Sequence, residues 1–223
     1  MDDTAAPTQP RQRAAAQERP APVLGGRRWF ALALLCTAFF MAVLDSTSVY
    51  TALPSIGEDL EFAPGGLQWV ITAYGLTVGG LLLLGGRIAD LLGRRRVFIA
   101  AVALFGGASL LCGLAWSSEV LIAGRALQGL GAAILTPAGL SILMTIFPEG
   151  RDRNRALGIW GGLGGTGATA GLLLGGPITE GLGWAWIFFV NVPVCVAVLA
   201  LCRALLPEGH AAPGRRQFDI AGA

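Results

Sequence analysis

Two ionisable residues lie inside long apolar stretches of the chain, Asp45 within residues 29–53 and Arg125 within residues 120–146. A charge is costly in an apolar segment that crosses a membrane, so such a residue normally faces a cavity or a partner and indicates function. Burial disfavours the charged form of a carboxyl group and a nearby cation favours it, so a carboxyl under both influences is suited to exchanging a proton. Asp45 is therefore the candidate for proton exchange, and Arg125 is a permanent cation that would bias it. The alternatives are an aspartate that never titrates and an arginine that extends to the membrane surface.

The elements that must position these residues are membrane-spanning helices. Of the 223 residues, 54% are hydrophobic and only 13% are charged, whereas soluble domains carry about 25% charged residues. Each long apolar segment can cross roughly 30 Å of hydrocarbon as a helix. Helices are expected because lipid cannot satisfy backbone N–H and C=O groups, and the alternation of a membrane barrel is missing. The fold class is therefore all-α integral membrane, with spans at 29–53, 67–86, 97–117, 120–146, 156–178 and 184–206.

Arginine clusters alternate with acidic connections along the chain. Arginines precede span one, lie between spans two and three and between spans four and five, and follow span six, while the other three connections carry only acidic charges. Basic residues favour the cytoplasmic side of a membrane. We therefore expect a multi-pass protein of the cell (plasma) membrane with both termini in the cytoplasm. The predicted regions are a disordered cytoplasmic tail (1–27), a six-helix bundle (28–206) and a cytoplasmic linker (207–223).

An internal repeat links the two halves of the bundle. Residues 82–93 and residues 172–183, ninety positions later, both begin Leu-Leu-Leu-Gly-Gly and carry an acidic residue, Asp90 or Glu180. The first copy ends span two on the cytoplasmic side, and the second ends span five on the outer side. Equivalent segments on opposite faces are what two inverted three-helix repeats predict. Chance similarity within a leucine- and glycine-rich sequence is the alternative.

The short connection at residues 86–96 carries a compact motif. Its glycines permit close backbone approach, and its aspartate can pair with the arginines that follow. The segment resembles the signature loop between helices two and three of the major facilitator superfamily, and this resemblance implies a conformational latch between the two halves of a transporter. A signal that only fixes the cytoplasmic side is the alternative. The matching residues are Gly86, Asp90, Gly93, Arg94 and Arg95.

Span one carries a second resemblance, to the first-helix motif of the fourteen-helix drug:proton antiporters. The motif is Leu-Asp-x-Thr followed by an apolar stretch that ends Ala-Leu-Pro, and residues 44–54 follow it except that Tyr50 and Thr51 replace the commoner Asn and Val. Residues 121–133 resemble the fourth-helix motif of the superfamily, which implicates Arg125 in proton coupling. Residues 184–193 resemble the Trp-Arg-Trp-x-Phe…Asn-x-Pro start of helix six, with Ala185 in place of the arginine.

Two further sets of residues are candidates for a cavity or for helix packing. Helical spacing places Gln128 and Thr136 on the same small or polar face of span four as Arg125, which suits a cavity lining. Span five has glycines every four residues, which permit close helix contact. This stretch resembles an antiporter motif whose proline is replaced here by Leu172. The glycines are Gly167, Gly171 and Gly175.

Together the motifs predict the N-terminal half of a proton-coupled exporter of small hydrophobic or amphipathic molecules, such as drugs or antibiotics, that works by alternating access. The end of the chain resembles the approach to a seventh helix, so we expect a truncated half of a longer transporter. The expected partners are the lipid bilayer, the substrates, and the missing C-terminal half or a second copy, with no nucleic acid. The alternatives are a major facilitator transporter of a specific metabolite and a membrane remnant that does not transport.

The sequence argues against an enzyme and against a metal protein. An intramembrane hydrolase needs a base beside its nucleophile, and the single histidine, His210, lies outside every predicted span. The four cysteines are scattered without metal-ligand spacing,. We therefore expect no catalytic residue, no metal site and no cofactor, with the proton as the coupling ion.

Overall fold

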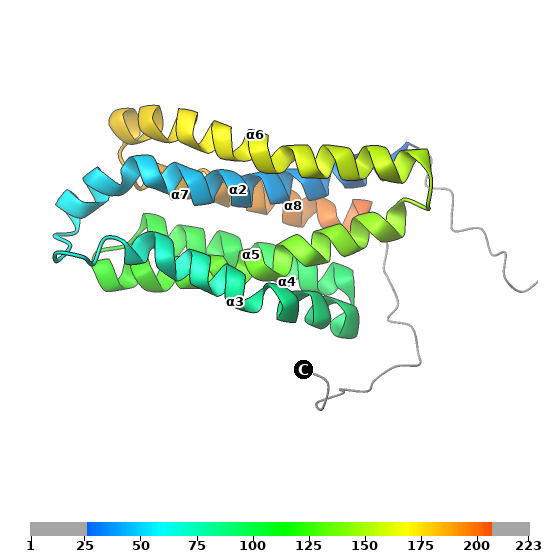
Figure 1. Cartoon of the computed structure of the whole chain (residues 1–223), viewed down its shortest axis with the longest axis horizontal. Helices are drawn as coiled ribbons and strands as arrows, with labels where there is room; N and C mark the ends of the chain where they lie inside the picture. The colour runs from blue at the N-terminus through cyan, green and yellow to red at the C-terminus, as the bar shows by residue number, and fades with distance from the viewer. Residues whose placement is uncertain (1–25, 207–223) are drawn as a thin grey trace, which may run out of the picture.

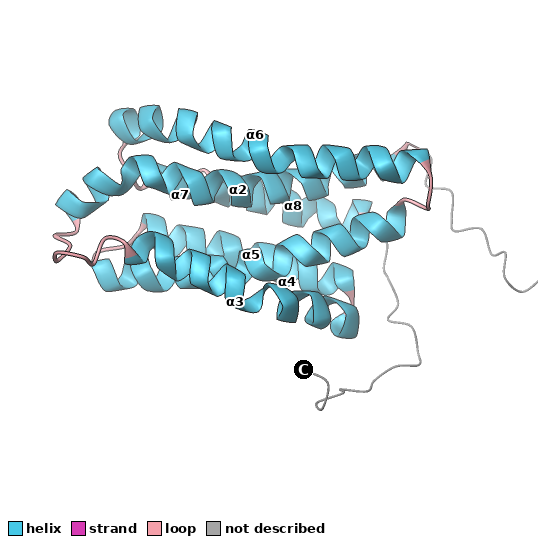
Figure 2. Cartoon of the chain, viewed as in Figure 1, coloured by secondary structure: helices cyan, strands magenta, loops and turns pink. Residues whose placement is uncertain are grey.

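The computed structural model describes residues 26–206, which form long helices connected by short turns (Figures 1 and 2). Six helical stretches in this range are long and apolar enough to cross a membrane, the last of them Trp186–Leu205. The helices are α2 (Arg27–Asp59), α3 (Trp69–Leu92), α4 (Arg94–Gly113), α5 (Ser118–Ile146), α6 (Arg151–Leu182), α7 (Trp186–Phe189) and α8 (Asn191–Leu205). The prediction of an all-α membrane bundle with six spans is confirmed.

The helices pack in two neighbouring groups, with α3, α4 and α5 in one and α2, α6, α7 and α8 in the other (Figure 1). The main contacts pair α3 with α5, α2 with α6 and α4 with α5, and α8 lies against α4 and α2. If the first three spans are matched in order with the last three, α3 corresponds to α6 and α5 corresponds to α2. The α3–α5 contact and the α2–α6 contact are then equivalent. The two copies of the sequence repeat also lie at opposite ends of the bundle, as an inverted repeat requires.

Two departures from the predicted spans occur near prolines. The first span was predicted to end at residue 53, but α2 continues through Pro54 to Asp59. The sixth span is divided at Val190, between α7 and α8. Pro193 lacks the N–H that a continuous helix would donate to the carbonyl of Phe189, so the chain restarts its helix at this point, where a first-turn proline is tolerated. Transmembrane helices tolerate such prolines because their surroundings satisfy the freed carbonyls.

A stripe of glycines joins α6 to α2. A methyl group at Gly171 would overlap the hydroxyl of Thr47 and lie 2.5 Å from the carbonyl oxygen of Leu44, and one at Gly175 would lie 2.9 Å from the carbonyl oxygen of Ser48. The backbones of α2 and α6 therefore approach each other more closely than any larger residue would allow. The same stripe includes Gly167, which faces Val43, so all three glycines lie between α6 and α2.

Arginines gather at one end of the bundle and make contacts that join distant segments. Arg28 forms an ion pair with Asp152 at 2.6 Å, and Arg27 donates to the carbonyl of Ala204. At the opposite end, the indole N–H of Trp184 donates to Asp59 at 2.8 Å. The predicted linker 207–223 lies outside the described residues, as does the predicted tail 1–27 except for residues 26 and 27.

Candidate functional site

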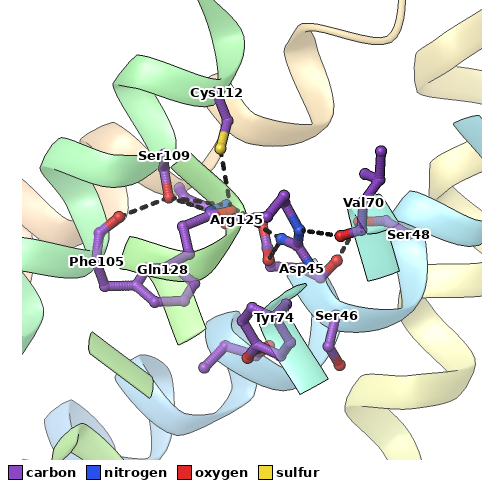
Figure 3. Close-up of polar contacts among 12 residues, drawn as sticks. Asp45, Ser46, Ser48, Val70, Tyr74, Phe105, Ser109, Cys112, Arg125 and Gln128 are labelled. Carbon is purple, nitrogen blue, oxygen red and sulfur yellow. Dashed lines mark hydrogen bonds and ion pairs between the residues drawn. The ribbon is translucent and has the colours of Figure 1, made fainter. Parts of the chain in front are cut away.

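Asp45 and Arg125 meet in the interior of the bundle, as Figure 3 shows. The guanidinium Nη1 of Arg125 lies 2.6 Å from Oδ2 of Asp45, and the exposed fractions of the two side chains are 1% and 0%. The two residues are eighty positions apart in the chain and come from α5 and α2. The alternative that Arg125 extends to the membrane surface is therefore wrong, because its guanidinium group is buried and pairs with a buried carboxylate.

Two amides complete the hydrogen bonds of the Asp45 carboxylate. Gln128 on α5 donates from Nε2 to Oδ1 at 3.1 Å, and Asn191 on α8 donates from Nδ2 to the same oxygen at 2.7 Å. Gln128 also accepts from Arg125 Nη1 at 2.8 Å. Ser109 on α4 accepts from both amides, at 2.7 Å from Gln128 and 3.4 Å from Asn191. All of these polar side chains are buried.

Arg125 is held from its other sides by α3 and α7. Its Nε donates to the backbone carbonyl of Val70 at 3.1 Å, and its guanidinium carbon lies 4.3 Å from the ring centroid of Tyr74. The ring of Phe188 lies 5.8 Å away. A cation over an aromatic face is stabilised by the ring quadrupole. The arginine therefore has acceptors and rings around it in addition to its counter-ion, which is what a buried charge needs.

Helical spacing explains how so few residues build this cluster, here called the Asp45 cluster: Asp45, Ser109, Cys112, Arg125, Gln128 and Asn191. Arg125 and Gln128 are three residues apart and share one face of α5, and Ser109 and Cys112 share one face of α4 in the same way. The thiol of Cys112 donates to Oε1 of Gln128 at 3.4 Å. Four helices, α2, α4, α5 and α8, thus each direct a polar residue to one point.

This arrangement suits a negative charge on Asp45. An ionised carboxylate only accepts hydrogen bonds, and here it has a cation and two amide N–H donors,.

The predicted latch residues lie at the arginine-rich end, apart from the Asp45 cluster. Asp90 on α3 accepts from Arg94 on α4 at 3.2 Å, and both side chains are substantially exposed. Arg94 also donates to the carbonyl of Ser141 and the hydroxyl of Thr145 on α5. The turn between α3 and α4 consists of Gly93, whose φ of +98° suits glycine,.

The other predicted site residues are placed as follows. Arg95 donates to the backbone carbonyl of Arg203 at 3.2 Å, which connects α4 to α8. Gly86 lies beside Pro137 on α5. Thr136 is half-buried three turns beyond Arg125 on α5, and no described hydrogen bond links it to the Asp45 carboxylate. The structure thus brings together three of the predicted residues, Asp45, Arg125 and Gln128.

Asn191 and Ser109 belong to the Asp45 cluster but were not among the predicted site residues. Ser109 sits in a span that showed no motif, so its role depends on a helix contact that the sequence does not display. Asn191 did have a signal, because it is the asparagine of the Asn-x-Pro segment at residues 184–193. A buried asparagine within an apolar span is a reason to look for a polar partner.

Comparison with known proteins identifies relatives of the chain. A family model described as Major Facilitator Superfamily matches residues 35–219. The puromycin resistance protein of Streptomyces alboniger is 47% identical over 196 residues, which cover 88% of this chain and 39% of the relative. The cephamycin export protein of Amycolatopsis lactamdurans is 47% identical, with 86% of this chain and 40% of the relative covered.

A third relative, the multidrug resistance protein Stp of Mycobacterium tuberculosis, is 39% identical over 193 residues, with 86% of this chain and 36% of the relative covered. The chain therefore spans about two-fifths of the length of these curated relatives.

Proposed function

This chain belongs to the major facilitator superfamily, and on that premise we propose that it is the first six-helix bundle of a proton-coupled exporter of small amphipathic molecules. The observation that carries the proposal is the buried Asp45–Arg125 ion pair. A buried ion pair inside a membrane bundle comes at a cost in stability. Proton coupling gives a reason for that cost, because one carboxyl must be able to exist in both charge states during transport.

The substrate class is proposed from the relatives. Proteins named for puromycin resistance, cephamycin export and multidrug resistance all match most of this chain. Their names differ in the compounds that they mention, which favours export of amphipathic antibiotics or drugs over transport of one defined metabolite. A panel that includes chemically unrelated antibiotics and common metabolites distinguishes the two, because a metabolite transporter would move only one class. We propose no catalytic role and no cofactor besides the proton.

The arginine-rich end is proposed to face the cytoplasm of the cell, with both termini on that side. Arg28, Arg95 and Arg153 all lie at this end, and the acidic Asp59 lies at the other. Reporter domains fused after Arg95 and Arg153 are expected to read as cytoplasmic, and one inserted beside Gly181 as external. A cytoplasmic reading at Gly181 would contradict this topology.

The proposed partner of the bundle is a second helical bundle, either a C-terminal half or a second copy of this chain. Two helices, α3 and α6, carry much of their apolar surface exposed. Several glycines on these helices have open space where a side chain would stand, which leaves room for close helix contact,. Alternating access in such transporters is a rocking of one bundle against another around a shared site. Those glycines are Gly75, Gly79, Gly80, Gly161, Gly164 and Gly165.

Efflux against an imposed pH gradient tests the proposed function. In a complete transporter that contains this chain, Asp45→Asn is expected to abolish proton-driven efflux of an amphipathic dye, because asparagine is similar in size but cannot ionise. Arg125→Lys is expected to keep partial activity if charge alone matters, since lysine lacks the planar fork. Expression and membrane insertion are matched between variants. The chain of 223 residues without a second bundle is expected to insert into the membrane but not to transport. Wild-type efflux in Asp45→Asn would remove this residue from the coupling mechanism.

A further inference from the structure

Asn191 has an unusual hydrogen-bonding state at the start of α8. Its side chain is fully buried, and its Nδ2 donates to Oδ1 of Asp45 at 2.7 Å and to Oγ of Ser109 at 3.4 Å. Its carbonyl oxygen, Oδ1, is also buried but has no hydrogen-bond partner among the described residues. Buried acceptors are normally paired, so a free one beside an ionisable group requires an explanation.

The partners of Asp45 suit only its charged form. Arg125, Gln128 and Asn191 all donate to the carboxylate. A protonated carboxyl also has an O–H, and that O–H needs an acceptor when it is buried. When Asp45 is protonated, its O–H would therefore point at a hydrogen-bond donor. One of the three neighbouring residues must present an acceptor oxygen instead.

Asn191 is the neighbour that can supply this oxygen. Arg125 has no acceptor atom at all. The side-chain carbonyl of Gln128 is already engaged, since it accepts from Arg125 at 2.8 Å and from the thiol of Cys112 at 3.4 Å. The carbonyl of Asn191 is unengaged, and half a turn of its amide exchanges the N–H₂ and C=O groups without moving the backbone.

We propose that Asn191 is a positioning residue that follows the protonation state of Asp45: its amide donates to the carboxylate and, after turning, accepts from the neutral acid. This inference rests on the proposed proton exchange at Asp45. The turn lets the cluster satisfy both charge states of one carboxyl.

The surroundings leave Asp45 as the group that drives this turn. The ionisable side chains that face Asp45 are Arg125 from α5, Tyr74 from α3, Cys112 from α4 and Cys195 from α8. Arg125 keeps its charge throughout. Phenol and thiol groups in apolar surroundings stay neutral because burial disfavours their anions. A pH-dependent turn of the amide therefore reports on the carboxyl.

Infrared difference spectroscopy of the 223-residue chain in lipid bilayers tests the proposal, because the chain has only two asparagines, Asn154 and Asn191. With ¹³C-labelled asparagine in an Asn154→Gln background, one labelled amide band remains. When Asp45 is protonated, we expect this band to move to lower wavenumber, since its carbonyl gains a hydrogen bond. The band and the carboxyl band of Asp45 should change at the same pH, and Asp45→Ser, which adds no asparagine, should abolish both changes.

Two results would overturn the inference in distinguishable ways. A carboxyl band that titrates while the labelled amide band stays fixed removes the role of Asn191 and leaves proton exchange at Asp45 standing. A carboxyl band of Asp45 that never titrates removes the proposed proton exchange, and the inference with it. The measurement needs no substitution at Asn191 itself, so it does not depend on the folding of a core variant.

A matched pair of substitutions separates positioning from packing. Threonine and valine have the same shape, but only the threonine hydroxyl can donate to a carboxylate or accept from an acid. We expect Asn191→Thr to titrate at nearly the wild-type midpoint. We expect Asn191→Val to titrate at a less acidic midpoint, because the carboxylate loses a charge-assisted donor that is worth more than the acceptor lost by the neutral acid. Equal midpoints in the two variants would contradict the proposal.

Discussion

The centre of the bundle and its arginine-rich end each hold an aspartate paired with an arginine, but the two pairs lie in opposite environments. Asp45 and Arg125 are 2.6 Å apart and fully buried, and they come from helices that are distant in sequence. Asp90 and Arg94 are 3.2 Å apart, four residues apart in the chain, and 58% and 41% exposed. The same two residue types thus form a costly, many-partnered cluster in one place and a weak local contact in the other.

This difference shows that burial, more than the identity of the residues, decides what an ion pair does. Removing one partner of a buried pair leaves an uncompensated charge in a medium that cannot solvate it. Removing one partner of an exposed pair leaves a charge that water solvates at once. The central pair is therefore expected to carry both stability and proton exchange, while the pair at the end is free to break and re-form during conformational change.

The largest expected effect tests the central pair. Arg125→Leu is expected to lower the free energy of unfolding by about 3–5 kcal/mol, because it leaves the Asp45 carboxylate buried without a cation. Reversible denaturation of the purified chain in detergent, followed by circular dichroism, measures this change. Asp90→Leu is the control in the exposed pair, because it leaves the contacts of Arg94 with α5 in place, and its expected loss is about 1 kcal/mol or less,. Equal losses in the two variants would remove the distinction between the pairs.

The second prediction applies the same contrast to the glycines of α6. Gly171→Ala is expected to destabilise the chain by about 1–3 kcal/mol, since the new methyl group would overlap Thr47 on α2,. Gly165→Ala is the matched control on the same helix, where nothing lies within 4 Å of the new methyl group. Alanine favours helix over glycine, so this control is expected to gain up to about 1 kcal/mol. A gain in both variants would show that α6 does not press against α2.

Much of the fold could be predicted from the sequence because apolar length and arginine placement are local signals. The six spans, the inverted repeat and the glycine stripe at Gly171 all follow from patterns within one helix or between two similar segments. The helix ends were less predictable, because α2 passes through Pro54 and α6 begins at Arg151, within a segment that was expected to be a loop. Pro54 is tolerated because its surroundings satisfy the carbonyl that it frees, and α6 extends over its arginines because arginine is a good helix former.

The candidate site was predictable only where a charge marked it. Asp45 and Arg125 stood out because charges are rare in apolar spans, and Gln128 followed from its spacing to Arg125 on α5. Ser109 and Asn191 are neutral and lie on other helices. They join the cluster through contacts between residues far apart in the chain: Asn191 lies 82 positions from Ser109 and 146 positions from Asp45. Such contacts depend on how helices pack, which no periodicity within a single helix records.

The smallest expected effect concerns Asp90, and it separates a latch from a stabilising contact. Asp90→Asn is expected to change the free energy of unfolding of the chain by about 0.2–1 kcal/mol, because the pair is exposed and lies within one helical turn,. Arg94 keeps its contacts with Ser141 and Thr145 on α5 when Asp90 is replaced, so the helices stay joined at this end. Added salt is expected to erase even this small difference, since exposed charges are screened. Chemical denaturation at low and high salt measures both values.

The same substitution in a complete transporter then tests the latch. A clear loss of efflux with unchanged stability supports a conformational latch. A loss of stability of several kcal/mol in the chain alone would instead mean that Asp90 holds the bundle together and that its exposure is misleading.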